Sequence, residues 1–378
     1  MSASAYDVAI VGAGIMGASS AFFLAQRGYS VVLLEADRVG RQASGTNFGN
    51  VRRQGRPFSQ MPLANRARDV WGRLPELIGD DCEFVARGHL RLALDEEDAD
   101  RLAAYRDEAV HHGLDMEMLT GNAVRDRFPY LSERVRAGCF APIDGHANPR
   151  LSAPGFARAA QRLGVRIKEM APVISAARAG EDFIVETGDG QSFRAPALLI
   201  AAGAWSAPLT STFGEPVSYE VKGPQMAVTE PAPYFIGPSI GVASHLPDEG
   251  VYFRQVARGN IIMGGPRYGL ADANAWRSYV LPDNTLRQFD RTRSLLPVLS
   301  KLRVIRVWSG IESYFDDAQP VMGPSPSVPG LYYAFGFSGQ GFQLGPGVGE
   351  VMAELIATGA TSTPLDAFSL ARFAGLQS

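Results

Sequence analysis

Three glycines near the start of the chain have the spacing of a phosphate-binding turn. The stretch Val8–Ala21 reads VAIVGAGIMGASSA, in which Gly12, Gly14 and Gly17 directly follow an apolar run. Gly12 would permit a tight turn, Gly14 would let the main chain approach a diphosphate, and Gly17 would let a helix lie close to a strand. The pattern therefore predicts a dinucleotide site, and the alternative is a glycine-rich turn in an unrelated α/β protein.

The elements that would position these glycines can be read on both sides of them. Tyr6–Val11 is an apolar, β-branched run typical of a buried strand, and Ala18–Arg27 is expected to form a helix that ends at Gly28. A second strand, Ser30–Leu34, is followed by Glu35, whose carboxylate could accept hydrogen bonds from ribose hydroxyls. The free N–H groups at the helix start would face the phosphates. This βαβ unit predicts dinucleotide binding, but it does not separate NAD from FAD.

Three further stretches favour a flavin. Residues 40–53, GRQASGTNFGNVRR, are rich in small and hydrogen-bonding side chains and could follow a long cofactor, although they could also be a solvated loop. The buried strand Ala197–Ala202 leads into Gly203, and small residues there allow close approach of a ligand. Residues 332–335 form a strand that leads through glycines into a helix at 348–356. This second helix start would stabilise negative charge on a reduced flavin ring, unless it serves packing alone.

Together these motifs resemble the FAD-dependent D-amino-acid oxidase superfamily. The matching segments are GAGIMGAS with Glu35, SGTNFGNVR, AAGAW and GFSGQGFQLGPGVGE. The glycine oxidase, sarcosine oxidase and opine oxidase branches are the most similar. The NFGNV segment with the glutamine and glycine after it resembles the beta subunits of opine oxidases and of hydrogen-cyanide synthase. The resemblance implies an α/β fold with a discontinuous Rossmann-like FAD-binding domain and an α+β substrate domain built on a mainly antiparallel sheet.

The resemblance also implies which residues contact FAD. They are Gly12, Gly14, Ile15, Met16, Gly17, Glu35, Ala36, Ser44, Gly45, Asn47, Gly49, Asn50, Val173, Ala202, Gly203, Trp205, Gly310, Gly336, Ser338, Gly339, Gln340, Gly341, Phe342 and Gln343. Monomeric sarcosine oxidases carry a flavin-linking cysteine in the segment aligned with residues 310–312, and this chain has none there, so non-covalent FAD is expected. Those enzymes also have a lysine where Gln343 stands, and their oxygen-reactive lysine has no match in residues 260–265.

In such proteins a hydride passes from the carbon next to an amine to the flavin, and the imine is hydrolysed. A substrate carboxylate then needs a cation, for which arginine is well suited. Arg254 is the expected carboxylate clamp, with Tyr252 on the same face of the strand, although both could be structural. Arg52 resembles a family arginine near the flavin ring. Glu312 could hold a substrate ammonium or be structural, and His245 could tune the proton of the amine or be a polar loop residue.

The cofactor motifs lie far apart, so the FAD-binding domain is predicted to be discontinuous. It takes residues 1–87, 143–216 and 306–378, and the substrate domain takes residues 88–142 and 217–305. Within this layout we expect a hairpin from 182–186 and 191–194, substrate-domain strands at 222–230, 250–254 and 260–264, and helices at 95–112 and 282–296.

Composition narrows the class of protein. The net charge of −3 gives a nucleic-acid partner no support. The two cysteines, Cys82 and Cys139, lack metal spacing, so they are expected to be reduced and structural, and no metal site is predicted. No run reaches 18 apolar residues, so no membrane span is expected and the protein is predicted to be cytoplasmic.

The expected partners are a carboxylated amine as substrate, and oxygen or another electron acceptor. One alternative is a flavoprotein subunit of a larger amino-acid or opine dehydrogenase, which would pass its electrons to a partner chain. An NAD-dependent dehydrogenase is disfavoured by the second glycine-rich helix start.

Overall fold

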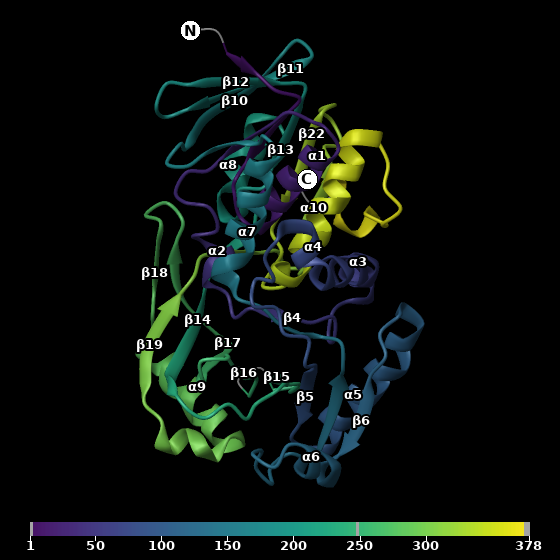
Figure 1. Cartoon of the computed structure of the whole chain (residues 1–378), viewed down its shortest axis with the longest axis vertical. Helices are drawn as coiled ribbons and strands as arrows, with labels where there is room; N and C mark the ends of the chain where they lie inside the picture. The colour runs from purple at the N-terminus through teal and green to yellow at the C-terminus, as the bar shows by residue number, and fades with distance from the viewer. Residues whose placement is uncertain (1–2, 247–248, 374–378) are drawn as a thin grey trace.

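Two large sheets lie in opposite halves of the molecule along its long axis (Figure 1). The computed structural model describes residues 3–246 and 249–373. The expected α/β class is confirmed, with a mainly parallel sheet in one half and a mainly antiparallel sheet in the other. Within the described residues, no helix combines the length and apolarity needed to cross a membrane.

The six-stranded sheet carries the first glycine-rich turn. Its order is β21 (Val321–Pro324), β22 (Leu331–Phe335), β13 (Ala197–Ile200), β2 (Val8–Val11), β3 (Val31–Leu34) and β9 (Arg166–Lys168), with only β21 antiparallel to its neighbour. Alternate residues of β2 enter two different cores, Val8 and Ile10 on one face and Ala9 and Val11 on the other. Burial on both faces explains why this strand is a continuous apolar run.

Helices cover one face of this sheet, and a small sheet covers the other. The helices are α1 (Ile15–Gln26), α7 (Pro149–Arg162) and α10 (Gly341–Thr358), with α3 (Met61–Gly72) packed on α10. The small sheet is β10 (Val173–Ala179), β11 (Asp182–Thr187) and β12 (Ser192–Ala195), with β1 (Ser4–Ala5) at its edge. The hairpin expected around residues 187–190 is thereby confirmed.

Both cofactor helices begin earlier than the sequence suggested. Helix α1 starts at Ile15 and not at Ala18, and α10 starts at Gly341, seven residues before the expected Val348. Gly345, Pro346 and Gly347 precede the expected start but are helical, and glycines in this segment allow close helix packing. A Cβ atom on Gly345 would lie 2.6 Å from Ile15 Cγ2, and one on Gly349 would lie 2.2 Å from Ser19 Oγ. Small residues therefore bring α10 against α1, and Ser19 Oγ donates to Gly345 O at 2.9 Å.

The second large sheet contains the expected substrate-domain strands. Its order is β19 (Val304–Ser309), β14 (Glu220–Pro231), β17 (Asn260–Asp272), β16 (Tyr252–Gln255), β15 (Ser239–Val242), β5 (His89–Ala93), β7 (Ala137–Ala141) and β6 (Glu117–Thr120). Strands β18 (Arg277–Tyr279) and β20 (Glu312–Tyr314) pair with β17 and β14. The expected helices are α5 (Glu96–Ala109), which a 3-10 turn extends to His112, and α9 (Pro282–Leu295).

Shorter elements complete the chain. They are α2 (Ala43–Thr46), β4 (Asn50–Val51), α4 (Leu74–Ile78), α6 (Gly121–Arg127), β8 (Gly145–His146) and α8 (Ser206–Thr212).

The predicted domain boundaries remain a prediction. Most strands of the two large sheets fall on the expected sides of them. Strand β19 crosses the expected boundary at residue 306, and β20 lies in a segment assigned to the FAD-binding domain yet pairs with β14 of the other sheet, Glu312 opposite Lys222. The ends of the predicted segments at residues 1–2 and 374–378 lie outside the described residues.

Candidate active site

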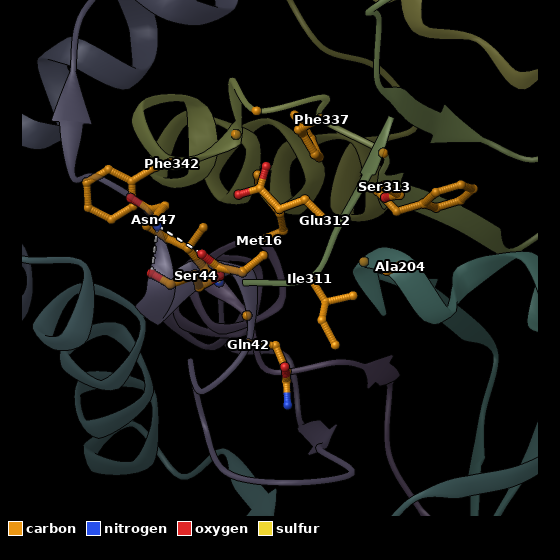
Figure 2. A pocket seen from close by; sticks show the side chains of 18 of the residues that line it. Met16, Gln42, Ser44, Asn47, Ala204, Ile311, Glu312, Ser313, Phe337 and Phe342 are labelled. Atoms are coloured by element: carbon orange, nitrogen blue, oxygen red, sulfur yellow. Dashed lines mark hydrogen bonds between the residues drawn. The ribbon is translucent and has the colours of Figure 1, made fainter. Parts of the chain in front are cut away.

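A cavity of about 840 Å³ runs between the two large sheets. Its lining includes the first glycine-rich turn, the segment around α2, the start of α10, and residues of β5 and β16 from the antiparallel sheet. Figure 2 shows Met16, Ser44 and Phe342 near one part of this cavity and Glu312 beside them. The motifs that sequence reasoning placed on one ligand therefore share one cavity.

The main chain at the start of α1 lines the cavity closely. A Cβ atom on Gly12 would lie 2.4 Å from Ala201 O, so only glycine fits where β2 and β13 end side by side. Gly12 also has φ +100°, a conformation that side-chain-bearing residues rarely adopt. Ser44 Oγ accepts a hydrogen bond from Ile15 N at 2.9 Å, which joins the α2 segment to the helix start.

Glu35 is held at the end of β3 by two main-chain donors. Its Oε2 accepts from Ala13 N at 2.7 Å and its Oε1 accepts from Asp37 N at 2.9 Å. Burial raises the pKa of this carboxyl, while the two N–H donors oppose that rise. Each oxygen keeps a lone pair that could accept a hydrogen bond from a hydroxyl group.

The start of α10 forms the cavity wall at the second glycine-rich segment. Gln340 is its N-cap residue and supplies no side-chain cap, so N–H groups of the first turn remain for a ligand. Arg56 fixes this turn through Gln340, its Nη2 donating to the main-chain oxygen at 3.0 Å and its Nη1 to the amide oxygen at 3.2 Å. Ser338 N donates to Ser313 O at 3.3 Å, which links the turn to β20.

Almost all of the predicted cofactor residues line the cavity. The exceptions are Gly17, Gly45 and Gly310. Each of these glycines is instead closely packed, so that an added Cβ atom would clash with a neighbour. The Cβ atom would lie 1.9 Å from Gly12 O at Gly17 and 2.3 Å from Gly40 O at Gly45. At Gly310 it would lie 2.4 Å from Thr46 Oγ1. These three glycines do not line the cavity themselves, but they allow the segments that line it to pack closely together.

The structure does not support Arg254 as a carboxylate clamp. Arg254 lies on the same strand as Tyr252, as expected, but it is 3% exposed and does not line the cavity. Its Nε donates to Phe48 O at 2.8 Å, its Nη1 to His146 Nδ1 at 3.2 Å and its Nη2 to Ala147 O at 3.3 Å. The segment carrying Phe48 lies between this guanidinium and the cavity, so Arg254 positions that segment.

His245 is also away from the cavity. Its main-chain N donates to Asp98 Oδ1 at 2.7 Å, and its ring Nδ1 lies 3.1 Å from the same oxygen. This contact with Asp98 raises the pKa of His245. The structure therefore places His245 against the start of α5, and not near a substrate amine.

Glu312 does line the cavity, beside a cluster of tyrosines. Tyr314 donates to its Oε2 at 2.9 Å, and the Tyr314 ring packs on Tyr268 with centroids 5.1 Å apart. Burial raises the pKa of Glu312 to about 7. The carboxyl therefore changes charge near neutral pH. Figure 2 shows its carboxylate directed toward the segment that carries Phe337.

Tyr252 and Arg52, the remaining predicted catalytic residues, both line the cavity. The Tyr252 ring packs edge-on against Phe48, with centroids 4.7 Å apart. Burial lowers the pKa of Arg52, whose guanidinium Nη1 donates to Gln54 O.

Sequence reasoning missed Arg56, His89 and Arg91, which also line the cavity. A signal was present for two of them. In the strand sequence HLRLA, His89 and Arg91 are two residues apart and so share one face, while apolar neighbours occupy the other. Arg56 had no such signal, since it follows β4 in an irregular segment whose course depends on tertiary contacts.

Comparisons with known proteins agree with this geometry. The model of the family DAO, described as FAD dependent oxidoreductase, matches residues 7–355. A glycine oxidase of Geobacillus kaustophilus is 29% identical in sequence over 382 residues, and the match covers 98% of each chain. The crystal structure of the glycine oxidase from that organism superposes with a TM-score of 0.89 at 26% identity. This superposition covers 98% of this chain and 99% of that chain.

Two further relatives are parts of larger enzymes by name. The beta subunit of sarcosine oxidase from Rhizobium meliloti is 28% identical, covering 97% of this chain and 88% of the relative. One subunit of an opine oxidase from Rhizobium meliloti is 27% identical, covering 97% of each chain.

Proposed function

Because the chain belongs to the DAO family of FAD-dependent oxidoreductases, we propose that it oxidises the carbon–nitrogen bond of an amino acid or N-substituted glycine. Sarcosine-, opine- and iminodiacetate-like amines fall in this class. The relatives named for glycine, sarcosine and opines support the class, and their identities of 27–29% leave the individual substrate open.

The residues present fit FAD. A side chain at Gly12 would clash with the main chain of Ala201. The starts of α1 and α10, whose N-cap residues supply no side-chain hydrogen bond, line the same cavity. The start of α1 would hold the diphosphate, the Glu35 carboxylate would accept hydrogen bonds from the ribose hydroxyls, and the start of α10 would lie by the flavin ring. When bound, FAD supplies the oxidising chemistry by taking a hydride from the carbon next to the amine.

We propose that this FAD is held without a covalent bond to cysteine. Cys82 and Cys139 are buried, free and outside the cavity lining, and burial raises their thiol pKa values to about 12 and about 11. Acid precipitation of the yellow protein should release all of the flavin into the supernatant. Colour retained in the pellet would contradict non-covalent binding.

The observation that carries the substrate assignment is the presence of Glu312 and Arg52 in one cavity lining. An amino acid has an ammonium group and a carboxylate, and these two side chains offer the opposite charges. The Arg52 guanidinium would hold the carboxylate, the Glu312 carboxylate would hold the nitrogen, and apolar neighbours such as Met226 and Val251 would exclude water from the carbon between them.

Anaerobic mixing with a panel of amines tests this function. Bleaching of the flavin by N-methylglycine, glycine or iminodiacetate, but not by the same amines lacking a carboxylate, is the expected result. A flavin that no carboxylated amine reduces would refute the proposal.

A second candidate is a flavoprotein subunit that passes electrons to a partner chain. Two relatives are named as subunits, which favours it. Oxygen consumption with the isolated chain supports an oxidase, whereas turnover only with an artificial acceptor supports the role of a subunit. The cytoplasmic location stays a prediction.

A further inference from the structure

Three arginines line the cavity outside the first glycine-rich turn. Arg52 and Arg56 come from the segment after β4, and Arg91 comes from β5 of the antiparallel sheet. The Nη1 atoms of Arg91 and Arg52 lie 2.1 and 3.5 Å from the point that a Cβ atom on Gly55 would occupy, so less than about 6 Å separates them. Two guanidinium groups therefore face the same small volume.

These three cations lack carboxylate partners. In the part of the chain that the structure describes, none of the three forms an ion pair. The nearby buried carboxylate of Asp144 is already bound by Arg53, whose main-chain N donates to it at 2.8 Å and whose Nε donates to it at 3.2 Å. Like charges gathered away from water repel one another, and such a group is stable only when an anion compensates it.

The three arginines differ in how many of their hydrogen-bond donors are already used within the protein. Arg56 is committed to Gln340, and Arg52 donates one bond to Gln54 O. The side chain of Arg91 forms no hydrogen bond within the described residues, and the residue is only partly exposed, so its guanidinium donors remain for a ligand. Since Arg91 is carried by the antiparallel sheet with Tyr252, and α1 belongs to the other half of the molecule (Figure 1), the diphosphate site is not its partner.

The neighbouring charges agree with an anion site. Burial and the Arg52 charge lower the pKa of Arg91 to about 10 and that of Arg56 to about 9, and burial with both Arg52 and Arg91 lowers the pKa of His89 well below its usual range. His89 is therefore neutral, with its Nδ1 donating to Gln54 Oε1 at 2.8 Å. Among the described residues that line the cavity, the carboxyls are Glu35, which lies at the end of β3, and Glu312.

We propose that Arg91 binds a second substrate carboxylate, so that the substrate is an amine with two carboxylates. This rests on the proposed function, in which Arg52 holds the first carboxylate. An imino-diacid, with a carboxylate on each side of the nitrogen, and an aminodicarboxylic acid, with both on one side, share this chemistry. A substrate with a single carboxylate leaves Arg91 uncompensated.

Unreactive thioether analogues test the site independently of turnover. Calorimetry of the FAD-loaded protein would compare thiodiacetate, (methylthio)succinate and (methylthio)acetate, in which sulfur replaces the amine nitrogen. We expect one of the two dicarboxylates to bind at least about tenfold more tightly than the monocarboxylate, since a hydrogen bond to a charged group is worth about that much. Which dicarboxylate binds more tightly identifies the arrangement.

The variant Arg91→Met removes the charge and keeps much of the side-chain volume. It should weaken the preferred dicarboxylate at least about tenfold and change (methylthio)acetate by less than about threefold. Arg87→Met is the matched control, because Arg87 is exposed, precedes the same strand and lies over Tyr234 outside the cavity lining. Arg91→Lys, which keeps a charge, should recover part of the affinity and guards against a folding defect.

Equal binding of all three analogues, or an equal loss of all three in Arg91→Met, would overturn the inference. The proposed function is judged separately by flavin bleaching. If N-methylglycine and iminodiacetate bleach the flavin equally well, the function stands and the second carboxylate site does not. If thiodiacetate binds through Arg91 and no amine bleaches the flavin, the site stands and the function does not.

Discussion

The guanidinium of Arg56 binds Gln340 twice, through its main-chain oxygen and through its side-chain amide oxygen. These residues are 284 positions apart. The contact joins the segment after β4 to the first turn of α10, and both line the cavity.

Loss of this contact should loosen the flavin. Arg56→Met removes both bonds to Gln340, and we expect FAD to dissociate at least about tenfold more readily, since each bond to a charged group is worth roughly 1.5–3 kcal/mol. Flavin fluorescence on dilution measures the dissociation constant. Arg66→Met is the control, because Arg66 also ties α3 to α10, through Glu350 and Glu354, outside the cavity lining. Equal flavin affinity in the two variants would contradict the prediction.

Arg254→Met should affect stability more than substrate choice. The change leaves Phe48 O and Ala147 O without their donor, so the free energy of unfolding should fall by about 2–4 kcal/mol. Urea denaturation measures the fall, and Arg258→Met, at an exposed position beyond the same strand, should change it by less than about 0.5 kcal/mol. A selective rise in KM for carboxylated substrates, with unfolding unchanged, would restore the clamp role.

Substrate capture should depend on the charge of Glu312. Its raised pKa of about 7 means that the carboxyl is neutral in acid and anionic above that pH, so attraction of a substrate ammonium should grow as pH rises through about 7. We expect kcat/KM to rise through this range, and Glu312→Gln to abolish the step and lower kcat/KM at least about tenfold at alkaline pH. A step of unchanged height and midpoint in Glu312→Gln would assign it to another group.

The same shift predicts an effect on stability without flavin. The folded state keeps the Glu312 proton to a higher pH than the unfolded state does, so the buried carboxyl lowers stability as pH rises from the usual glutamate range to about 7. Glu312→Gln should therefore stabilise the flavin-free protein above about pH 7 by up to roughly 3 kcal/mol, and have little effect near about pH 4. Thermal unfolding of both proteins across this range measures the difference.

Gly55→Ala should displace Arg91. Gly55 has φ +76°, and an added Cβ atom would lie 2.1 Å from Arg91 Nη1, so the guanidinium must move. Gly180→Ala is a matched control, because Gly180 has φ +70° in the β10–β11 turn with no atom within 4 Å of the new Cβ. Both variants should lose about 1 kcal/mol of stability from the backbone conformation. Gly55→Ala alone should weaken dicarboxylate binding, and equal binding by both variants would contradict this placement of Arg91.

The elements of the cofactor half of the fold could be predicted from the sequence because the patterns that indicate them are local. Strand β2, helix α1, strand β3 and Glu35 follow one another in the chain, and each has its own pattern of burial or turn chemistry. The first residues of α1 and α10 were harder to predict. Glycines at 345 and 349 lower helix propensity, and only the contacts with Ile15 and Ser19 show why they are tolerated.

The substrate side was harder to predict because tertiary contacts decide it. Strand alternation correctly placed Tyr252 and Arg254 on one face, but no local pattern reveals that the Phe48 segment covers Arg254. In the same way, Arg52 and Arg91 meet over Gly55 only because β5 of the antiparallel sheet comes next to the segment after β4. Which arginine is free for a ligand depends on partners that are distant in sequence.

The packing of α10 on α1 has a consequence for biosynthesis. The Ser19–Gly345 hydrogen bond joins positions 326 residues apart, and the cavity wall at Gly339–Phe342 emerges from the ribosome only after all of the residues before it. Until then, the nascent chain must keep the apolar faces of β2 and α1 from aggregating. Flavin can be captured in the full cavity only after α10 has been made, so translation of this helix sets the earliest moment of cofactor loading.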